Sequence, residues 1–377
     1  MSGLIESLAP GDVIICCGSG GVGKTTIAAV IGLELARLGH RAVVVTIDPA
    51  KRLADALGVT GELGNEPTRL DVGGDRHGDG DGDISGELWA AMLDPAATFD
   101  DLVRQTAPNP EQAERILVNP FYRNIAGALS GTQEYMAAER LYALHGDPRF
   151  DIVIVDTPPS RHALDFLEAP GTLARFLDHP VFKLLMMPAR RGLGVFNAMA
   201  QPVLRSIGKV VGGDVLADAI AFFQAFDGME SGFRDRAGSV MALLHSDASK
   251  YVLVASPKRD TVEEAQYFAG RLHDASLRVN ALIVNRSTPV FSVVAAPDGT
   301  AATQRKPTRR KVDAALWANL DQLGALAAAE RDQLAPLVGD VDGAAVAWVP
   351  LLADDVHDLD ALERVRALLF SPPTPAG

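Results

Sequence analysis

Short, continuous runs of apolar residues alternate with longer amphipathic segments along most of this chain. Uninterrupted apolar runs are typical of parallel strands that are covered on both faces, while apolar residues three or four apart indicate a helix that packs on one side. The pattern therefore predicts an α/β fold with a doubly wound, mainly parallel sheet. The expected strands are residues 13–17, 41–47, 88–93, 151–155, 251–255, 279–284 and 345–349, and the expected helical runs include 25–38, 96–145, 261–274, 312–337 and 359–370.

Residues 172–245 depart from this alternation and predict a helical insertion. Four helical segments rich in Met, Phe and aliphatic residues fit here, around 182–187, 195–199, 220–226 and 240–244. Several of them carry more apolar surface than one packing face needs. Two interpretations stay open: the helices form their own small core or a dimer contact, or they line a groove for a hydrophobic client. We expect one α/β domain from residues 1–168 and 249–377, with a helical subdomain at 169–248.

Two polar segments interrupt the apolar pattern and are expected to be flexible surface loops, at residues 73–83 and 297–311. Asp79, Asp81 and Asp83 alternate as in a calcium loop, but that motif needs Gly and Glu where this chain has Ile84 and Ala90. The second segment is locally basic. A solvated loop is favoured there over an arm that binds nucleic acid.

Composition narrows the class of protein. The 377 residues include 35 Lys+Arg and 48 Asp+Glu, a net charge of -13, which argues against a nucleic-acid surface or general attraction to anionic lipid. No signal pattern or apolar run of about eighteen residues is visible, so a cytoplasmic protein is expected, with peripheral membrane association left open. The two cysteines, Cys16 and Cys17, are adjacent within an expected buried strand, which favours packing over a disulfide or metal pair.

The most specific motif is the sequence GSGGVGKT at residues 18–25. It has the G-x-x-x-x-G-K-[ST] spacing of a phosphate-binding loop and lies between an expected strand and an expected helix. Glycines let backbone N–H groups surround a phosphate, and the helix N-terminus adds partial positive charge. Lys24 can reach the β- and γ-phosphates of ATP, and Thr25 can hold Mg²⁺ through its hydroxyl. The expected nucleotide-binding positions are Gly20, Gly21, Val22, Gly23, Lys24, Thr25 and Thr26.

Two aspartates follow expected strands and complete the candidate chemistry. Carboxyl ends of parallel strands share one edge of the sheet, so Asp48 and Asp156 are expected near the phosphate loop. Asp48 could instead cap the helix that runs to Leu57. Asp156 is expected to bind Mg²⁺ directly or through water, and the stiff turn that begins Asp156-Thr157-Pro158 is suited to report on a γ-phosphate.

These motifs, taken in order, resemble the arsenite-pump ATPase family, which includes the guided-entry ATPases that target tail-anchored membrane proteins. The resemblance covers essentially the whole chain. Its most specific parts are Gly20 to Thr26 and the Asp-Pro-Ala-x-x-Leu-x-Asp-Ala sequence at residues 48–56.

The resemblance implies a role for each matched residue. Asp48 orients the attacking water, and Asp156, Thr157, Pro158 and His162 belong to the second switch, which couples the γ-phosphate to the helical insertion. Asn285 hydrogen-bonds the adenine edge, and the loop at Pro350, Leu351 and Leu352 closes over the base. It further implies a Mg²⁺-dependent ATPase that works as a homodimer or a heterodimer and whose nucleotide state opens and closes the subunits around a hydrophobic client.

The chain also departs from the family. Members usually carry a lysine directly after the first loop glycine, which reaches the partner's nucleotide, whereas this chain has Ser19. Slow hydrolysis, or pairing with a related subunit that supplies the lysine, would follow, unless Lys51 or Arg52 replaces it. A weakly active regulatory subunit of a heterodimer is therefore the alternative function. Cys16 and Cys17 cannot build the arsenite or zinc sites of the family, so an arsenite pump is not expected.

Overall fold

A computed structural model describes residues 1–48, 52–59, 61, 63–72, 85–126, 132–158, 165–178, 213–290 and 311–370. The loops expected at 73–83 and at 297–310 lie outside these residues, as do His162, Lys51 and the segments 182–187 and 195–199. Lys311, the last residue of the second expected loop, begins a helix. Among the described residues, no helix is long and apolar enough to cross a membrane.

The centre of the molecule is an eight-stranded sheet with the strand order β3-β4-β2-β5-β1-β6-β7-β8. All seven strands expected from the sequence are present and parallel to one another, which confirms the predicted doubly wound, mainly parallel sheet. β3 is an additional two-residue strand antiparallel to β4. The strands are β1 Val13–Gly18, β2 Arg41–Thr46, β3 Thr68–Arg69, β4 Glu87–Met92, β5 Ile152–Asp156, β6 Ser249–Ala255, β7 Val279–Ser287 and β8 Ala345–Pro350.

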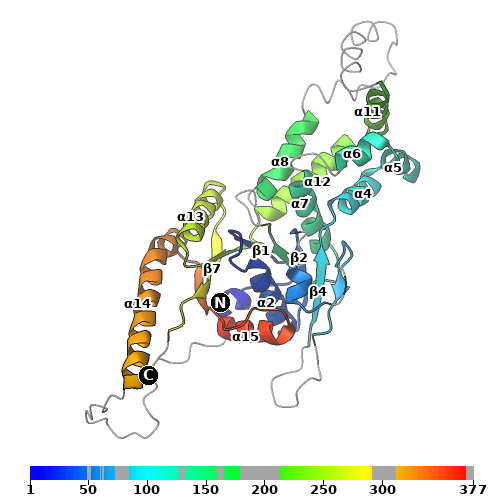
Figure 1. The fold of residues 1–377 in the computed structure, drawn as a ribbon. Helices are drawn as coiled ribbons and strands as arrows, with labels where there is room; N and C mark the ends of the chain where they lie inside the picture. Colours follow the sequence, from blue (N-terminus) through cyan, green and yellow to red (C-terminus); the bar gives the residue numbers. More distant parts are fainter. Residues whose placement is uncertain are drawn as a thin grey trace, which may run out of the picture.

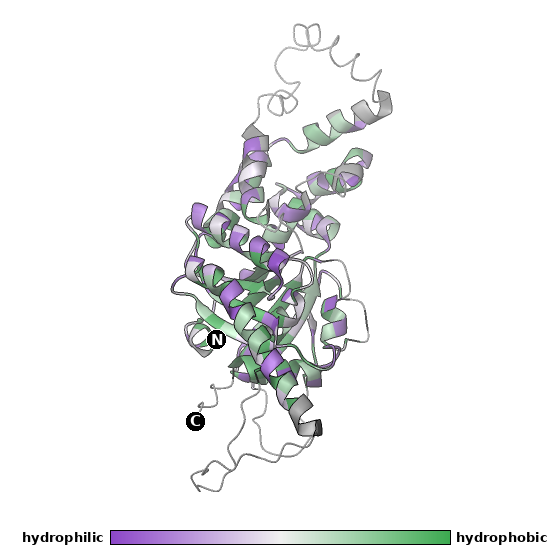
Figure 2. Ribbon diagram, turned by 60° about the vertical axis from the view of Figure 1, so that its left-hand side comes forward, coloured by the Kyte–Doolittle hydropathy of each residue, from purple (hydrophilic) through white to green (hydrophobic). Residues whose placement is uncertain are grey.

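Helices cover both faces of the sheet, which explains why its central strands read as continuous apolar runs. In β1, Ile14 and Cys16 join the core on one face, while Val13, Ile15 and Cys17 join the core on the other. Figure 2 shows hydrophobic residues along the strands and on helix sides. The first core contains residues of α1 Ser2–Glu6, α2 Lys24–Arg37, α3 Arg52–Ala56 and α15 Leu359–Phe370; the second contains residues of α7 Thr132–His145, α8 Asp165–Asp178, α12 Glu230–Leu244, α13 Arg259–Asp274 and α14 Lys311–Asp340.

A third core joins helices from two parts of the chain, those between β4 and β5 and those between β5 and β6. Residues of α4 Pro95–Thr106, α5 Pro110–Leu117, α6 Pro120–Ala126 and α7 pack with residues of α8, α11 Gly213–Ala225 and α12. These helices gather at one end of the molecule, away from α15 (Figure 1). The division into domains stays a prediction, but the helices before β5 share a core with those of the expected insertion.

Aromatic residues fill much of this third core. Phe222 of α11 stacks against Tyr122 of α6 with ring centroids 6.1 Å apart. The ring centroids of Phe226 and Phe233 are 4.8 Å apart. Phe222 and Phe226 are buried. These two residues therefore belong to a core, as one of the two interpretations expected, but it is a core shared with the helices before β5.

Candidate functional site

The phosphate loop joins β1 to α2 through backbone conformations that require glycine. Gly18 has φ 147° and Gly23 has φ 92°, both outside the range that other L-residues readily adopt. A Cβ at Gly18 would lie 2.1 Å from the Val254 carbonyl oxygen, and one at Gly23 would lie 2.3 Å from Nδ2 of Asn285. The loop is therefore pressed against the ends of β6 and β7, and α2 begins directly after it with Lys24.

Lys24 lies inside the loop rather than in solvent. Its Nζ donates a hydrogen bond to the backbone oxygen of Ser19 at 2.9 Å, and only 6% of the residue is exposed. Burial lowers the pKa of Lys24, and the negative charges of Asp156 and Asp48 act in the opposite direction. A phosphate oxygen would give this ammonium group a stronger acceptor than the carbonyl that it contacts here.

Asp156 ends β5 and meets the residues expected to hold a metal. Its Oδ2 accepts hydrogen bonds from Oγ1 of Thr25 at 2.7 Å and from Oγ1 of Thr46 at 3.0 Å. Its Oδ1 is buried and has no hydrogen-bond partner among the described residues. Burial raises the pKa of Asp156, although Thr25 and Lys24 lower it. Hard oxygen ligands at a charged, buried carboxylate fit Mg²⁺, so the donors present agree with that ion.

Asp48 lies at the same sheet edge, just beyond β2. Its backbone N–H donates to Oγ1 of Thr46 at 3.2 Å, and its carboxylate accepts from Nη1 of Arg52 at 3.2 Å. Thr46 thus contacts both Asp48 and Asp156. The contact with Arg52 ties Asp48 to the first residue of α3.

Of the remaining switch residues, Thr157 lies beside β1. Thr157 is 1% exposed, and its Oγ1 donates to the Cys16 backbone oxygen at 2.8 Å. Pro158 follows it, and His162 lies outside the described residues.

Burial raises the pKa of both cysteines, to about 12 for Cys17, which agrees with the expectation that they are packing residues.

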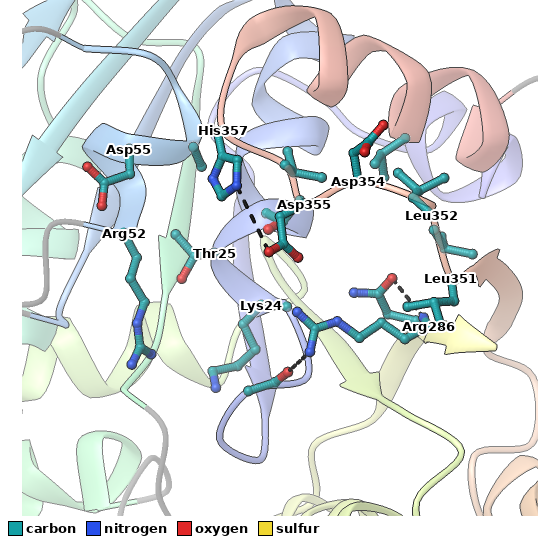
Figure 3. A pocket seen from close by; sticks show the side chains of 18 of the residues that line it. Lys24, Thr25, Arg52, Asp55, Arg286, Leu351, Leu352, Asp354, Asp355 and His357 are labelled. Carbon is teal, nitrogen blue, oxygen red and sulfur yellow. Dashed lines mark hydrogen bonds and ion pairs between the residues drawn. The ribbon is translucent and has the colours of Figure 1, made fainter.

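One cavity of about 430 Å³ brings most of the expected residues together (Figure 3). Its phosphate-loop end includes Lys24 and Thr25, and its other walls include Asn285, Pro350 and Leu351. Nδ2 of Asn285 donates to the Val22 backbone oxygen at 2.8 Å. The cavity thus places cationic and backbone donors near one end and apolar side chains farther along, as a nucleoside triphosphate requires.

Arg52 and Asp55 of α3, which belong to the motif at residues 48–56, also line the cavity. Other lining residues were not expected from the sequence. They are charged or titratable, come from the end of β7 and the loop after β8, and are Arg286, Asp354, Asp355 and His357. Figure 3 shows His357 directed toward Asp355, and their closest side-chain atoms are 4.0 Å apart. Their only signal in the sequence is adjacency to predicted residues, since Arg286 follows Asn285 and the acidic pair follows Leu352.

Ser19 occupies the position directly after the first loop glycine, where a lysine would have reached the nucleotide of a partner subunit. The residue is 3% exposed, and its Oγ has no hydrogen-bond partner within the described part of the chain. A buried serine supplies no positive charge to a neighbouring subunit.

Comparisons with known proteins agree with this geometry. A family model described as "Anion-transporting ATPase" matches residues 12–306. An ATPase get3 from Aspergillus terreus is 23% identical over 363 residues, which cover 95% of this chain and 90% of that protein. An ATPase GET3 from Rhodotorula glutinis is 26% identical over 272 residues, covering 71% and 68% of the two chains. One from Malassezia globosa is 30% identical over 164 residues, 44% of each.

Proposed function

Since the chain belongs to the anion-transporting ATPase family and is therefore an ATPase, we propose that it hydrolyses ATP with Mg²⁺ in the cavity beside the phosphate loop, and that its nucleotide state controls the handling of a hydrophobic client. The observation that carries the first part is the contact of Thr25 with Asp156 at the end of β5, next to Lys24. These three groups supply a cation for phosphate oxygens and oxygen ligands for a divalent ion.

The proposed chemistry is water attack on the γ-phosphoryl group. Lys24 exchanges the Ser19 carbonyl for β- and γ-phosphate oxygens, while loop N–H groups hold the β-phosphate. Thr25 and Asp156 would hold Mg²⁺, which when bound would supply positive charge to the triphosphate. Asp48 orients the attacking water by accepting its hydrogen bond. Catalysis then comes from positioning and charge neutralisation rather than from a strong base.

A path from the site to the helical end of the molecule is part of the proposal. Asp156 and Thr157 continue toward α8, whose Glu168 forms an ion pair with Arg271 of α13. α8 also packs against α12. Movement of the segment after β5, when a γ-phosphate is lost, would therefore shift α8 relative to the sheet. This coupling would let hydrolysis open and close a dimer.

The client is proposed to be a hydrophobic segment of a membrane protein or a lipid-like molecule. Phe222 and Phe226 are not available for it because they lie in the third core. The proposal therefore rests on the apolar residues at 182–187 and 195–199, whose placement lies outside the described residues. A cytoplasmic protein that meets the membrane peripherally during delivery would follow from such a client.

The client proposal is tested with a defined probe, a fluorescent peptide carrying about twenty Leu and Ala residues, the length of a membrane-spanning helix. Replacing Met186 and Met187 with Ser is expected to abolish peptide capture while ATP binding stays at the wild-type level. The matched control is Met241→Ser, a partly buried methionine of α12. Unchanged peptide capture by the double variant would contradict the client proposal.

A second candidate function is a weakly active regulatory subunit of a heterodimer with a related ATPase. The observation that favours it is Ser19, which supplies no cation to a partner's nucleotide. Loss of a comparable cation supplied in trans can cost ~10³-fold in rate. Turnover of the purified chain, alone and with a related subunit that carries the loop lysine, separates the two functions: a purely regulatory chain stays inactive alone.

A further inference from the structure

Strand β7 contains an irregularity where it reaches the cavity. Asn285 pairs with Val349 of β8 and Ser287 pairs with Pro350, so Arg286 is skipped in the register. Arg286 has φ 59°, in the left-handed region, and the only other described non-glycine residue with a positive φ is Ser276. Bulges of this kind re-aim a side chain, and left-handed residues other than glycine gather at functional sites.

The bulge turns the Arg286 side chain into the cavity. Oδ1 of Asn285 accepts the Arg286 backbone N–H at 2.9 Å, which supports the unusual conformation. Nη1 of Arg286 then donates to the backbone oxygen of Gly21 in the phosphate loop at 3.0 Å. The side chain is exposed. A planar guanidinium has five N–H donors and two flat faces. The hydrogen bond to Gly21 uses one of these donors and neither face.

The same bulge holds the loop after β8 next to Arg286. The backbone N–H of Leu351 donates to the Ser287 backbone oxygen at 2.8 Å, so the loop after β8 is tied to the residue next to Arg286. Leu351 is 57% exposed and lines the cavity beside Arg286 (Figure 3). A flat cationic group and a leucine thus lie near one another, beyond the phosphate loop.

We propose that Arg286 stacks the face of its guanidinium on the base of ATP, beside the loop after β8 that was expected from the sequence to close over that base. This inference rests on the proposed nucleotide site. A guanidinium attracts the face of an aromatic ring, and the exposed side chain of Leu351 adds apolar surface next to it. Glycine would fit the left-handed position of Arg286 better but has no side chain to stack.

The competing role for Arg286 is bracing of the phosphate loop through Gly21. The two roles differ in what they predict for a ligand that has phosphates but no base. A brace acts on the phosphate site and affects every ligand that binds there, whereas a stacking group affects only ligands with a base. Inorganic triphosphate is therefore the discriminating probe.

The experiment measures binding of ATP and of inorganic triphosphate, each with Mg²⁺, to the purified full chain by calorimetry. Wild type is expected to bind ATP more tightly than triphosphate. Arg286→Gly is expected to raise the Kd for ATP about tenfold and to leave that for triphosphate within about twofold. Arg286→Lys keeps the charge but not the flat face, so most of the loss remains. Because glycine suits a left-handed position, Arg286→Gly does not lower the melting temperature.

The matched control is Ser276→Gly, at the other left-handed position and away from the cavity, which keeps wild-type affinity for both ligands. Equal weakening of both ligands by Arg286→Gly, full rescue of ATP binding by Arg286→Lys, or no change in ATP binding would each overturn the stacking role. Failure of the proposed nucleotide site would instead show in the wild type, which would bind neither ligand.

Discussion

Lys24 and Asp156 place opposite charges in a part of the molecule that water hardly reaches. Burial lowers the pKa of Lys24 and raises the pKa of Asp156, which favours the neutral form of each group. The attraction between their two charges opposes both shifts. Buried charges are costly unless they are paired and hydrogen-bonded, and Oδ1 of Asp156 has no partner among the described residues. The site is thus built for a ligand at some expense of stability.

Asp156→Asn tests whether the buried carboxylate lowers the stability of the chain. Because the pKa of Asp156 in the folded chain is raised above its ordinary value of 3.8, the unfolded chain loses this proton first as pH rises, so wild-type stability is lost above that value. The variant is expected to melt about 2 °C or more above wild type at pH 7 without Mg²⁺ or nucleotide, which corresponds to roughly 1 kcal/mol. The measurement is the melting temperature between pH 5 and pH 8.

The difference between Asp156→Asn and wild type should widen as pH rises through the folded-state pKa of Asp156 and stay constant above it, and the variant should lose Mg²⁺-dependent hydrolysis. A variant that melts below wild type throughout the range from pH 5 to pH 8 would contradict a destabilising effect of the buried carboxylate. Asn is the matched change here because it keeps the size of the side chain and removes its charge.

At the residue scale, the sequence could predict the groups whose chemistry is tied to a motif. Lys24, Thr25 and Asp156 are brought together as the strand-end argument requires. Arg286 could not be found in this way, because a bulge depends on the register between β7 and β8 and leaves no periodic signal in either strand. Asp354, Asp355 and His357 were missed because a polar loop after a strand ordinarily indicates only solvent exposure.

At the scale of elements, the packing of α2 on the sheet depends on one small residue. A Cβ at Gly32 would lie 2.7 Å from Cγ2 of Val44 and 2.9 Å from Cδ1 of Leu88, and both side chains are fully buried. Because neither neighbour has room to move, α2 and the phosphate loop at its N-terminus would be displaced from β2 and β4.

Gly32→Ala is therefore expected to destabilise the protein by about 1–3 kcal/mol, the usual cost of overpacking a core. The control is Gly270→Ala in α13, where nothing lies within 4 Å of the added Cβ and a gain of about 0.5–1 kcal/mol is expected from helix propensity. Chemical denaturation of both variants measures the two free energies of unfolding. Similar values for the two would refute the close-contact argument.

The helices show what sequence patterns can and cannot specify. Pro110 and Pro120 divide the helical run expected at 96–145, and each begins a new helix, since proline fits the first turn. β3 was missed because two residues carry no periodicity. The core shared by α4, α5 and α6 with α11 joins distant segments, and the apolar pattern gives the presence of a buried face but not its partner.

Phe222 tests the importance of that shared core. Its ring lies against Phe121, Tyr122, Phe223 and Phe226, so Phe222→Ala removes contacts with both α6 and α11. A loss of about 3–5 kcal/mol of stability is expected, with Mg²⁺–ATP affinity preserved because the site lies at the sheet. Calorimetric unfolding and ATP titration together measure this; a stability change below 1 kcal/mol would place Phe222 outside the core.

For the whole molecule, the strand order explains why the site forms where it does. β1 lies between β5 and β6, and β2 lies beyond β5, so the ends of β1, β2 and β5 bring the phosphate loop, Asp156 and Asp48 to one edge. Helices on both faces hold these strands in place. The order itself could not be read from the sequence pattern alone, although the parallel arrangement could, because buried runs reveal coverage on both faces and not which strands are neighbours.

The most direct test of the central claim is steady-state ATP hydrolysis by the purified chain with Mg²⁺, measured beside Asp48→Asn as the blank and Ser19→Lys as a variant that adds a loop cation. We expect turnover in wild type, none in Asp48→Asn, and a faster rate in Ser19→Lys if two copies of this chain face one another. A wild-type rate equal to that of Asp48→Asn, with ATP still bound, would contradict a self-sufficient ATPase and direct the search to a partner subunit.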